Sequence, residues 1–341
     1  MDKYILYNND IPAAEFTVHN GGVAQFCPLA AELLPMQLRS AGAEGFLLWL
    51  NNRSIDLNTL LHRRLAYELL GTRDKLSLAL LTHMYSISDT FTCFRAGEFT
   101  ERARLCQPEA HAPVSSFILV SSDTSLRQLG TVTPNISTDG SFPKTWVYEG
   151  GAWWLYKLQS STATRCEVEI SATLRRCGWD AAVYRYDGSR RTRVKSLNFL
   201  GEAEFFEPYE SFRYYFDDRS DDEEVIYKNL ASLGEEFEHA WQRILLADAF
   251  FMNTDRHMRN FGVIRSSVTG NVLRLAPNFD NNQAYTANPG GRYSGVMLRA
   301  YMRGADRQKQ NALEALANAA SKSAFLKAAA EEAARLLTPA L

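Results

Sequence analysis

The sequence of 341 residues lacks the features that mark several classes of protein. Its five cysteines are scattered and form no C-x-x-C pair, so neither a disulfide framework nor a zinc site is expected. Its six histidines show no H-x-x-H or H-x-x-x-H spacing. No apolar run approaches the roughly 18 residues that cross a bilayer, and the first residues do not resemble a signal peptide. These features predict a cytoplasmic protein.

The chain also lacks an excess of charge of either sign. It carries 37 basic and 39 acidic side chains, a formal net charge of −2. This balance argues against a protein that coats nucleic acid or an anionic membrane through bulk electrostatics. The hydrophobic fraction of 46% is that of a folded protein, and the length suggests about two domains or one domain with a large addition.

The hydrophobic pattern changes along the chain. Residues 1–115 are expected to be mixed and then mainly helical, with a short strand near Tyr4. The following stretch predicts a β-hairpin, because two aromatic runs flank Glu149-Gly150-Gly151. Beyond it we expect a helix over 164–177, two strands around the turn Asp187-Gly188, a buried helix begun by a Ser232-x-x-Glu235 capping box, a hairpin over 263–275, and amphipathic helices over 308–341.

The most informative segment is Asn253-Thr254-Asp255-Arg256-His257-Met258-Arg259-Asn260, followed beyond the hairpin by Asp280. Phosphoryl transfer from a nucleotide needs a carboxylate near the attacking hydroxyl and oxygen ligands for Mg²⁺. The spacing from Asp255 to Asn260 equals that of the protein-kinase catalytic loop. Taken alone, this spacing also arises by chance in loops.

Further residues of the same chemistry precede this segment in the chain. The loop Ser137 to Lys144 contains a glycine among small polar residues and could bring backbone N–H groups and a lysine against phosphates. Lys157 ends an aromatic strand, and Glu167 and Glu169 follow in the next helix. Residues two apart lie on different faces of a helix, so only one of the two can reach Lys157. A lysine on a strand paired with a glutamate on a helix is the second half of a kinase site.

In this order the residues resemble the HipA-like serine/threonine kinases, bacterial toxin-type enzymes. Ser137-x-x-Gly140-x-x-x-Lys144 is similar to their phosphate loop, and Asp255-Arg256-His257-x-x-Asn260 to their catalytic loop. Ala276-Pro277-x-Phe279-Asp280-Asn281 is similar to the A-P-x-F-D-N metal motif of one branch. Two N-terminal stretches, Trp49 to Ile55 and Ser86 to Asp89, also resemble that branch, so the likeness covers most of the chain.

The resemblance implies an α+β, protein-kinase-like two-lobe fold with an N-terminal, mainly helical accessory region. It divides the chain into an accessory region over 1–115, a small β-rich N-lobe over 116–200 and a helical C-lobe over 201–341. It also implies an enzyme that uses ATP and Mg²⁺ to phosphorylate a serine or threonine of a protein. A small helix-turn-helix antitoxin is an implied partner, while direct binding of nucleic acid or membrane is not expected.

The resemblance also implies roles for matching residues. Asp255 would be the catalytic base, and Asn260 and Asp280 would hold Mg²⁺. Ser137 matches the serine that some members autophosphorylate to switch themselves off. The nucleotide would be contacted by Ser137, Thr138, Asp139, Gly140, Ser141, Phe142, Pro143 and Lys144 of the phosphate loop, by Lys157 and Glu167, by Lys195, Ser196 and Leu197 as a hinge beside the adenine, and by His257 and Asn260.

Two other functions stay open at this point. Asp255-Arg256-His257-x-x-Asn260 is also similar to the catalytic loop of phosphoinositide lipid kinases, although neither basicity nor an apolar amphipathic face indicates a membrane-docking surface. The other alternative is a non-enzymatic module, in which a kinase-like scaffold carries a region that binds a partner or DNA. No basic recognition helix in the sequence supports it.

Overall fold

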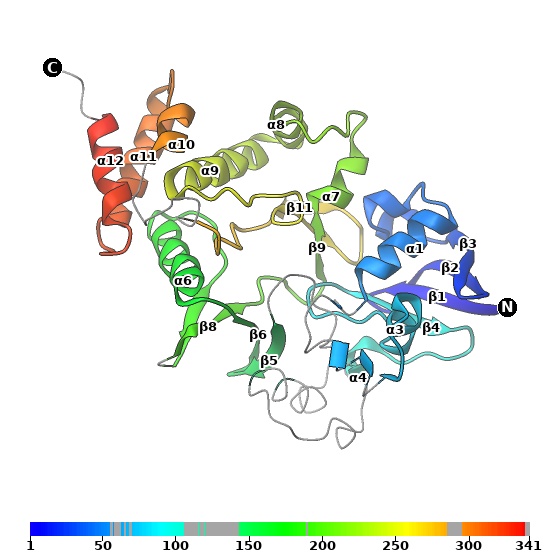
Figure 1. Cartoon of the computed structure of the whole chain (residues 1–341). Helices are drawn as coiled ribbons and strands as arrows, with labels where there is room; N and C mark the ends of the chain where they lie inside the picture. Colours follow the sequence, from blue (N-terminus) through cyan, green and yellow to red (C-terminus); the bar gives the residue numbers. More distant parts are fainter. Residues whose placement is uncertain are drawn as a thin grey trace.

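A computed structural model describes residues 1–54, 57, 63–64, 66–67, 70–105, 115, 119, 143–188, 190–284 and 295–337. The described part of the chain contains three antiparallel sheets and belongs to the predicted α+β class (Figure 1). Their strand orders are β3-β2-β1-β4, β5-β6-β8-β7 and β11-β10-β9. No described helix is long and apolar enough to cross a membrane.

The N-terminal region is built on the first sheet. Its elements are β1 (Asp2–Asn8), β2 (Ile11–His19), β3 (Gly22–Pro28), the short 3-10 helices η1 (Ala31–Leu33) and η2 (Met36–Leu38), α1 (Ala43–Asn52), α3 (Lys75–Leu81), β4 (Phe91–Arg95) and α4 (Arg102–Leu105). Aromatic side chains of β2, α1 and β4 form its core, among them Phe16, Phe46, Trp49 and Phe91.

The expected short strand near Tyr4 is β1, and after Pro28 the described part of this region is mainly helical, as expected; β2, β3 and β4, which complete a four-stranded sheet with β1, were not expected. The hydrophobic pattern of the sequence does not reveal β2 and β3, because β3 is an exposed edge strand and the pairing of β2 with β3 shifts register between Thr17 and Val18. Neither strand therefore shows the regular alternation of apolar and polar residues that identifies a half-buried strand.

The second sheet contains β5 (Lys144–Glu149), β6 (Ala152–Leu158), β7 (Tyr184–Asp187) and β8 (Arg190–Leu197), with α6 (Ser161–Arg176) packed against it. The predicted hairpin is confirmed: Glu149 pairs with Ala152 across Gly150 and Gly151, whose φ angles of 57° and 82° suit a tight two-residue turn. The predicted helix over 164–177 and the two strands around Asp187-Gly188 are also confirmed.

The remaining chain is largely helical. Its elements are β9 (Glu204–Pro208), α7 (Tyr209–Phe212), the 3-10 helix η5 (Arg213–Tyr215), α8 (Glu223–Ala231), α9 (Glu235–Phe251), β10 (Gly262–Ser266), β11 (Val272–Leu275), α10 (Val296–Tyr301), α11 (Arg307–Ala320) and α12 (Lys327–Leu337). The predicted hairpin over 263–275 and the helices near the C-terminus are confirmed. One core joins apolar side chains of α6, α9, α11 and α12, including Ile170, Phe250 and Leu316.

The predicted capping box at Ser232 and Glu235 is wrong. Ser232 ends α8, where its hydroxyl donates to Asn229 O at 2.7 Å, and Gly234 precedes α9 with a φ of 139°. Helix α8 ends directly before α9 begins, and Ser232 lies at the C-terminal end of α8. It therefore does not act as the N-cap of α9, a position that Gly234 occupies.

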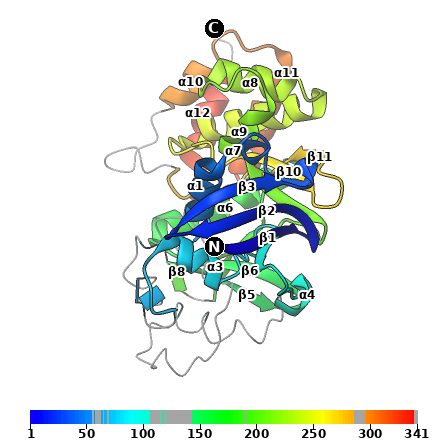
Figure 2. The same ribbon diagram turned by 90° about the vertical axis from the view of Figure 1, so that its right-hand side faces the viewer.

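A buried ion pair fixes the N-terminal region to the helical lobe. Arg265 of β10 is fully buried and donates to Glu207 Oε2 of β9 at 2.5 Å, to Leu34 O at 2.9 Å and to Glu32 O at 2.8 Å. Glu207 Oε1 in turn accepts from Met36 N at 2.6 Å. The N-terminal sheet therefore lies beside both lobes, with the C-terminal helices above it and β5, β6 and β8 below it in Figure 2.

Candidate active site

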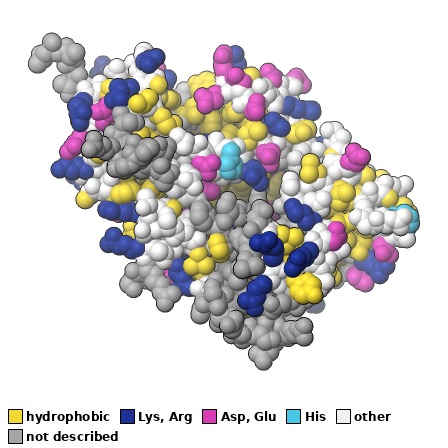
Figure 3. All heavy atoms as spheres, viewed as in Figure 1, with side chains coloured by type: hydrophobic (Ala, Val, Ile, Leu, Met, Phe, Trp, Pro, Cys, Tyr) yellow, Lys and Arg dark blue, Asp and Glu magenta, His cyan; other side chains and the backbone are white. Residues whose placement is uncertain are grey.

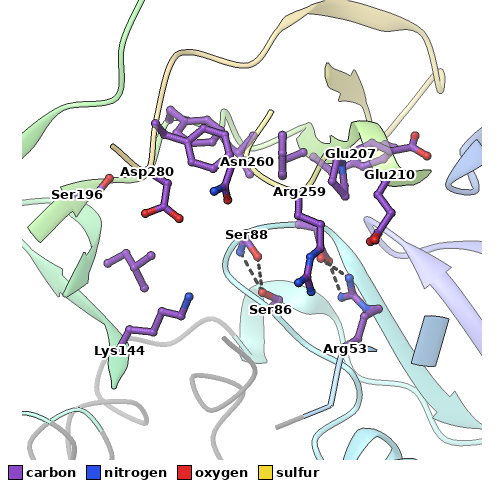
Figure 4. Close-up of a pocket in the computed structure, with 18 of the residues that line it drawn as sticks. Arg53, Ser86, Ser88, Lys144, Ser196, Glu207, Glu210, Arg259, Asn260 and Asp280 are labelled. Atoms are coloured by element: carbon purple, nitrogen blue, oxygen red, sulfur yellow. Dashed lines mark hydrogen bonds and ion pairs between the residues drawn. The ribbon is translucent and has the colours of Figure 1, made fainter. Parts of the chain in front are cut away.

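A pocket of about 480 Å³ lies where the three parts of the chain meet. Strands β5, β6 and β8 line one side of it, the segment Asp255 to Asn260 and the segment Phe279 to Gln283 line a second side, and the N-terminal region supplies a third. In Figure 4, Lys144, Ser196 and Asp280 lie toward one end of the pocket, Arg53 and Glu210 toward the other, and Ser86 and Ser88 between them.

A buried lysine joins two carboxylates at one end of the pocket. Lys157 Nζ lies 2.9 Å from Glu167 Oε1 and 2.8 Å from Asp280 Oδ1. The lysine side chain is 7% exposed and that of Glu167 is 0% exposed. Glu169, the alternative partner left open by the sequence, instead accepts from Ser323 Oγ at 2.9 Å. The phase of α6 thus presents Glu167, and not Glu169, to the strand lysine.

The charges of this group are set by their contacts. Burial opposes the charge on Lys157, but the carboxylates of Asp280 and Glu167 outweigh it and hold the pKa of the amine well above its usual value. Burial also opposes the negative charge of the Asp280 carboxylate, yet the nearby Lys157 amine holds the pKa of Asp280 below its usual range. Complete burial raises the pKa of Glu167 to about 7, against the attraction of Lys157. Asp280 and Lys157 therefore stay charged at neutral pH.

The segment after α9 forms a tight loop. Helix α9 ends at Phe251, and the next residue, Met252, has a φ of 54° that turns the chain sharply before Asp255. His257 N donates to Asp255 O at 3.0 Å, and the side-chain amide of Asn260 donates to the same oxygen at 3.1 Å. Asp255, His257 and Asn260 all line the pocket, as expected from the sequence.

Arg256 ties this loop to the segment that carries Asp280. Its guanidinium donates to both carboxylate oxygens of Asp248, at 2.8 and 2.9 Å, and to Asn260 O at 2.9 Å. It also donates to Phe279 O at 2.6 Å and to Asn281 Oδ1 at 3.0 Å. Sequence reasoning gave Arg256 no role, because its partners come from separate elements of the chain.

Asp280 itself is held in a left-handed conformation, with a φ of 58°. Tyr184 Oη accepts from its backbone N–H at 3.2 Å, and Asn282 Nδ2 donates to its Oδ1 at 2.9 Å. A non-glycine residue with positive φ is uncommon and persists when its surroundings fix it. Tyr184 and Asn282 were not expected in these roles; their place next to Asp280 comes from the fold.

The oxygen atoms at this end of the pocket suit a hard cation. Both hydrogen bonds to the Asp280 side chain go to Oδ1, which leaves Oδ2 as a candidate ligand. The amide nitrogen of Asn260 is bonded within its loop, which leaves the amide oxygen as a second. Within the described residues no group of three or more His, Cys, Asp or Glu could hold a metal. In phosphate-transfer sites Mg²⁺ is commonly held by only one or two protein side chains, because the phosphates and water supply the other oxygen ligands.

The other expected nucleotide contacts divide into three groups. Ser137 to Phe142 lie outside the described residues. Lys144, Ser196 and Leu197 line the pocket. Pro143 and Lys195 are not among the lining residues. The carbonyl oxygen of Pro143 accepts from Leu158 N at the edge of the sheet, and the amine of Lys195 forms an ion pair with Glu149 and lies 5.0 Å from the Trp154 ring.

A small antiparallel sheet with one packed helix, set against a larger helical lobe, defines a protein-kinase-like fold. A family model for the HipA-like C-terminal domain matches residues 136–340, which is more than half of the chain. The chain belongs to the HipA-like family.

Two solved structures are similar to this chain. The first comes from the Shewanella oneidensis MR-1 toxin–antitoxin system, a complex of HipA, HipB and operator DNA; it is 14% identical, has a TM-score of 0.56 and covers 99% of this chain and 92% of that chain. The second is the Helicobacter pylori proinflammatory kinase CtkA, with 11% identity, a TM-score of 0.41, and coverage of 59% of this chain and 87% of that chain. No curated protein matches the sequence.

Proposed function

We propose that this protein is an ATP- and Mg²⁺-dependent kinase of the HipA-like toxin type, which transfers the γ-phosphate to a serine or threonine of a protein. The observation that carries the proposal is the convergence of Lys157, Glu167 and Asp280 in the pocket that Asp255 and Asn260 also line. These residues come from β6, α6 and two separate loops, and phosphoryl transfer requires them together.

Each residue has a defined task in this reaction. Lys157 places a fixed positive charge against the nucleotide phosphates, and Glu167 holds the amine in position. Asp255 orients the acceptor hydroxyl and takes its proton. Asn260 and Asp280 would hold Mg²⁺, which neutralises charge on the phosphates when bound. Arg256 fixes the distance between the two loops that carry these groups.

Three finer proposals rest on the family. Ser137 is proposed as an autophosphorylation site, because a phosphate adds about two negative charges where the nucleotide phosphates bind. A small helix-turn-helix antitoxin is the proposed partner, in line with the HipA, HipB and DNA complex of Shewanella oneidensis. Residues 1–115, 116–200 and 201–341 are the proposed accessory region, N-lobe and C-lobe of a cytoplasmic protein.

A protein acceptor is favoured over a lipid. Acidic and basic side chains are both spread over the face shown in Figure 3, which also carries scattered apolar groups. A lipid kinase needs a docking surface of basic and apolar residues. Incubation with labelled ATP and either cell protein or phosphoinositide vesicles separates the two functions, since a lipid kinase would label the vesicles.

Replacement of Asp255 by Asn tests the proposal. Loss of the base should lower the rate of phosphate transfer by about 10²- to 10⁴-fold. Asp217→Asn makes the same chemical change at an exposed residue and should leave the rate unchanged. Calorimetry should show that wild-type protein binds Mg-ATP and that Lys157→Met does not. Wild-type protein that binds no Mg-ATP, or an Asp255→Asn variant with normal transfer, contradicts the proposal.

A further inference from the structure

One of the segments of the N-terminal region that line the candidate active site is the loop Tyr85 to Thr90. Ser86, Ser88 and Asp89 of this loop line the same pocket as Asp255, Asn260 and Asp280. Tyr85, Ser86, Ile87, Asp89 and Thr90 are buried, and Ser88 alone is exposed. In Figure 4, Ser88 lies between Asp280 and Arg53, and Asn260 lies above it. The one accessible side chain of the loop therefore opens onto the site of phosphate transfer.

Ser88 also differs from the other hydroxyl groups around the pocket. Within the described part of the chain, the remaining hydroxyl-bearing residues that line it are all buried: Ser54, Ser86, Tyr184, Ser196 and Ser211. Ser211 is committed to Glu207 Oε1 at 2.6 Å, and Tyr184 to the backbone of Asp280. Among the described residues that line the pocket, Ser88 is thus the hydroxyl-bearing residue that is exposed.

Two arginines hold the loop in place. Arg53 of the segment after α1 forms a double ion pair with Asp89, one bond of which is 2.8 Å long, and donates to Met84 O at 3.0 Å. Arg102 donates to Ser86 O at 2.9 Å and also to Asp89 O. The loop is therefore anchored through both its side chains and its backbone.

The entry to the loop and the orientation of Ser88 are fixed as well. His83 and Met84 precede the loop with φ angles of 52° and 56°, a conformation that non-glycine residues rarely adopt. Backbone bonds from Met84 N to Ala79 O, at 2.8 Å, and from Cys93 N to His83 O, at 2.9 Å, hold this turn. Ser86 Oγ accepts from Ser88 N at 3.2 Å and lies 2.7 Å from Ser88 Oγ. Such strain, fixed by surrounding bonds, is typical of functional segments.

We propose that Ser88 is a phosphorylation site of this protein, modified by the active site of its own chain. The proposal rests on the proposed kinase function. Ser88 Oγ forms a bond to the γ-phosphorus of ATP, the bond from that phosphorus to the β–γ bridging oxygen breaks, and ADP leaves. The hydroxyl proton passes to the carboxylate of Asp255. Because the loop already holds the hydroxyl in the pocket, the reaction needs no encounter with a second molecule.

The test is mass spectrometry of the purified full-length protein after incubation with Mg-ATP. Trypsin cleaves after Lys75 and Arg95 and so releases Ser88 in a peptide separate from the one, ending at Lys144, that carries Ser137. We expect phosphate at Ser88, formed at a first-order rate that does not depend on protein concentration. The Ser88→Ala variant should lack phosphate at residue 88, and the Ser88→Thr variant should retain it. The Asp255→Asn variant should carry no phosphate on Ser88. The melting temperature of each variant checks its folding.

A mixing experiment distinguishes reaction within one chain from reaction between chains. Asp255→Asn protein, whose Ser88 is intact, is incubated with active Ser88→Ala protein. Phosphate on Ser88 in this mixture overturns the intrachain reaction. Phosphate on the Ser137 peptide or on another protein, with none on Ser88 in the wild type, overturns the proposal while the kinase function stands. No phosphate transfer of any kind overturns both.

Discussion

The buried group around Lys157 allows a prediction in which stability and activity separate. Lys157→Met keeps the approximate volume of the side chain but leaves Glu167 and Asp280 without their shared cation. Nucleotide binding should be lost, because the amine that Glu167 and Asp280 hold in the pocket is gone. The protein should also become less stable, since Glu167 is completely buried.

The size of the effect follows from this burial. Removing one partner of a buried ion pair destabilises a protein by about 3–5 kcal/mol, because the other charge stays buried without compensation. Total stabilities are about 5–15 kcal/mol, so the loss is a large fraction. For a unit of roughly 200 residues it corresponds to a fall in melting temperature of about 10 °C. Adding Glu167→Gln to Lys157→Met replaces the buried acid with a neutral amide and should restore part of this stability, but none of the activity, because Asp280 still lacks its cation.

Thermal unfolding without nucleotide, together with Mg-ATP calorimetry, measures both effects. A matched double variant, Lys157→Met with Glu169→Gln, should stay as unstable as the single variant, because Glu169 bonds to Ser323 and not to the lysine. The reasoning is refuted if Lys157→Met melts like the wild type. It is equally refuted if Glu169→Gln rescues stability as well as Glu167→Gln does.

Three more predictions concern the site and its support. Burial raises the pKa of Glu167 to about 7, so this carboxyl gains a proton as the pH falls through that value, and its hydrogen bond with Lys157 weakens. The value of kcat/KM for Mg-ATP should therefore fall as the pH falls below about 7, and Glu167→Gln should abolish this pH dependence. Arg256→Lys keeps the charge but loses the fork that joins the two loops, so kcat should fall about 10- to 100-fold in steady-state assays. A Cβ added at Gly262 would lie 2.2 Å from Glu207 O, so Gly262→Ala should lower the free energy of unfolding in urea by about 3 kcal/mol or more.

Each of these has a control of the same chemistry. Glu169→Gln should leave the pH profile unchanged, and Arg175→Lys, at an exposed position on α6, should leave kcat unchanged. Gly22→Ala meets only an ordinary contact at 3.9 Å and should be nearly neutral. An unchanged pH profile in Glu167→Gln, full activity in Arg256→Lys, or wild-type stability in Gly262→Ala would each contradict the corresponding contact.

Elements whose pattern is local were predicted well from the sequence. The hairpin around Gly150 and Gly151 needs only two positive φ angles between aromatic strands, and helix α9 needs only one apolar face. The four-stranded N-terminal sheet was missed, because an edge strand and an interrupted register weaken the alternation on which such a prediction depends. The roles of Arg256 and Tyr184 were missed for a different reason, namely that their partners lie far away in the chain.

The residue types and their order along the chain, Lys157, Glu167, Asp255, Asn260 and Asp280, predict phosphate transfer, because residue types and the spacing within one loop or one helix can be read without the fold. Which glutamate meets the lysine depends on how α6 packs against β6, and this became visible in the folded chain. The tertiary structure also decided that the N-terminal region forms a wall of the same pocket, held there by the buried Arg265. Contacts between distant segments depend on how whole sheets and helices pack, and no short stretch of sequence records that packing.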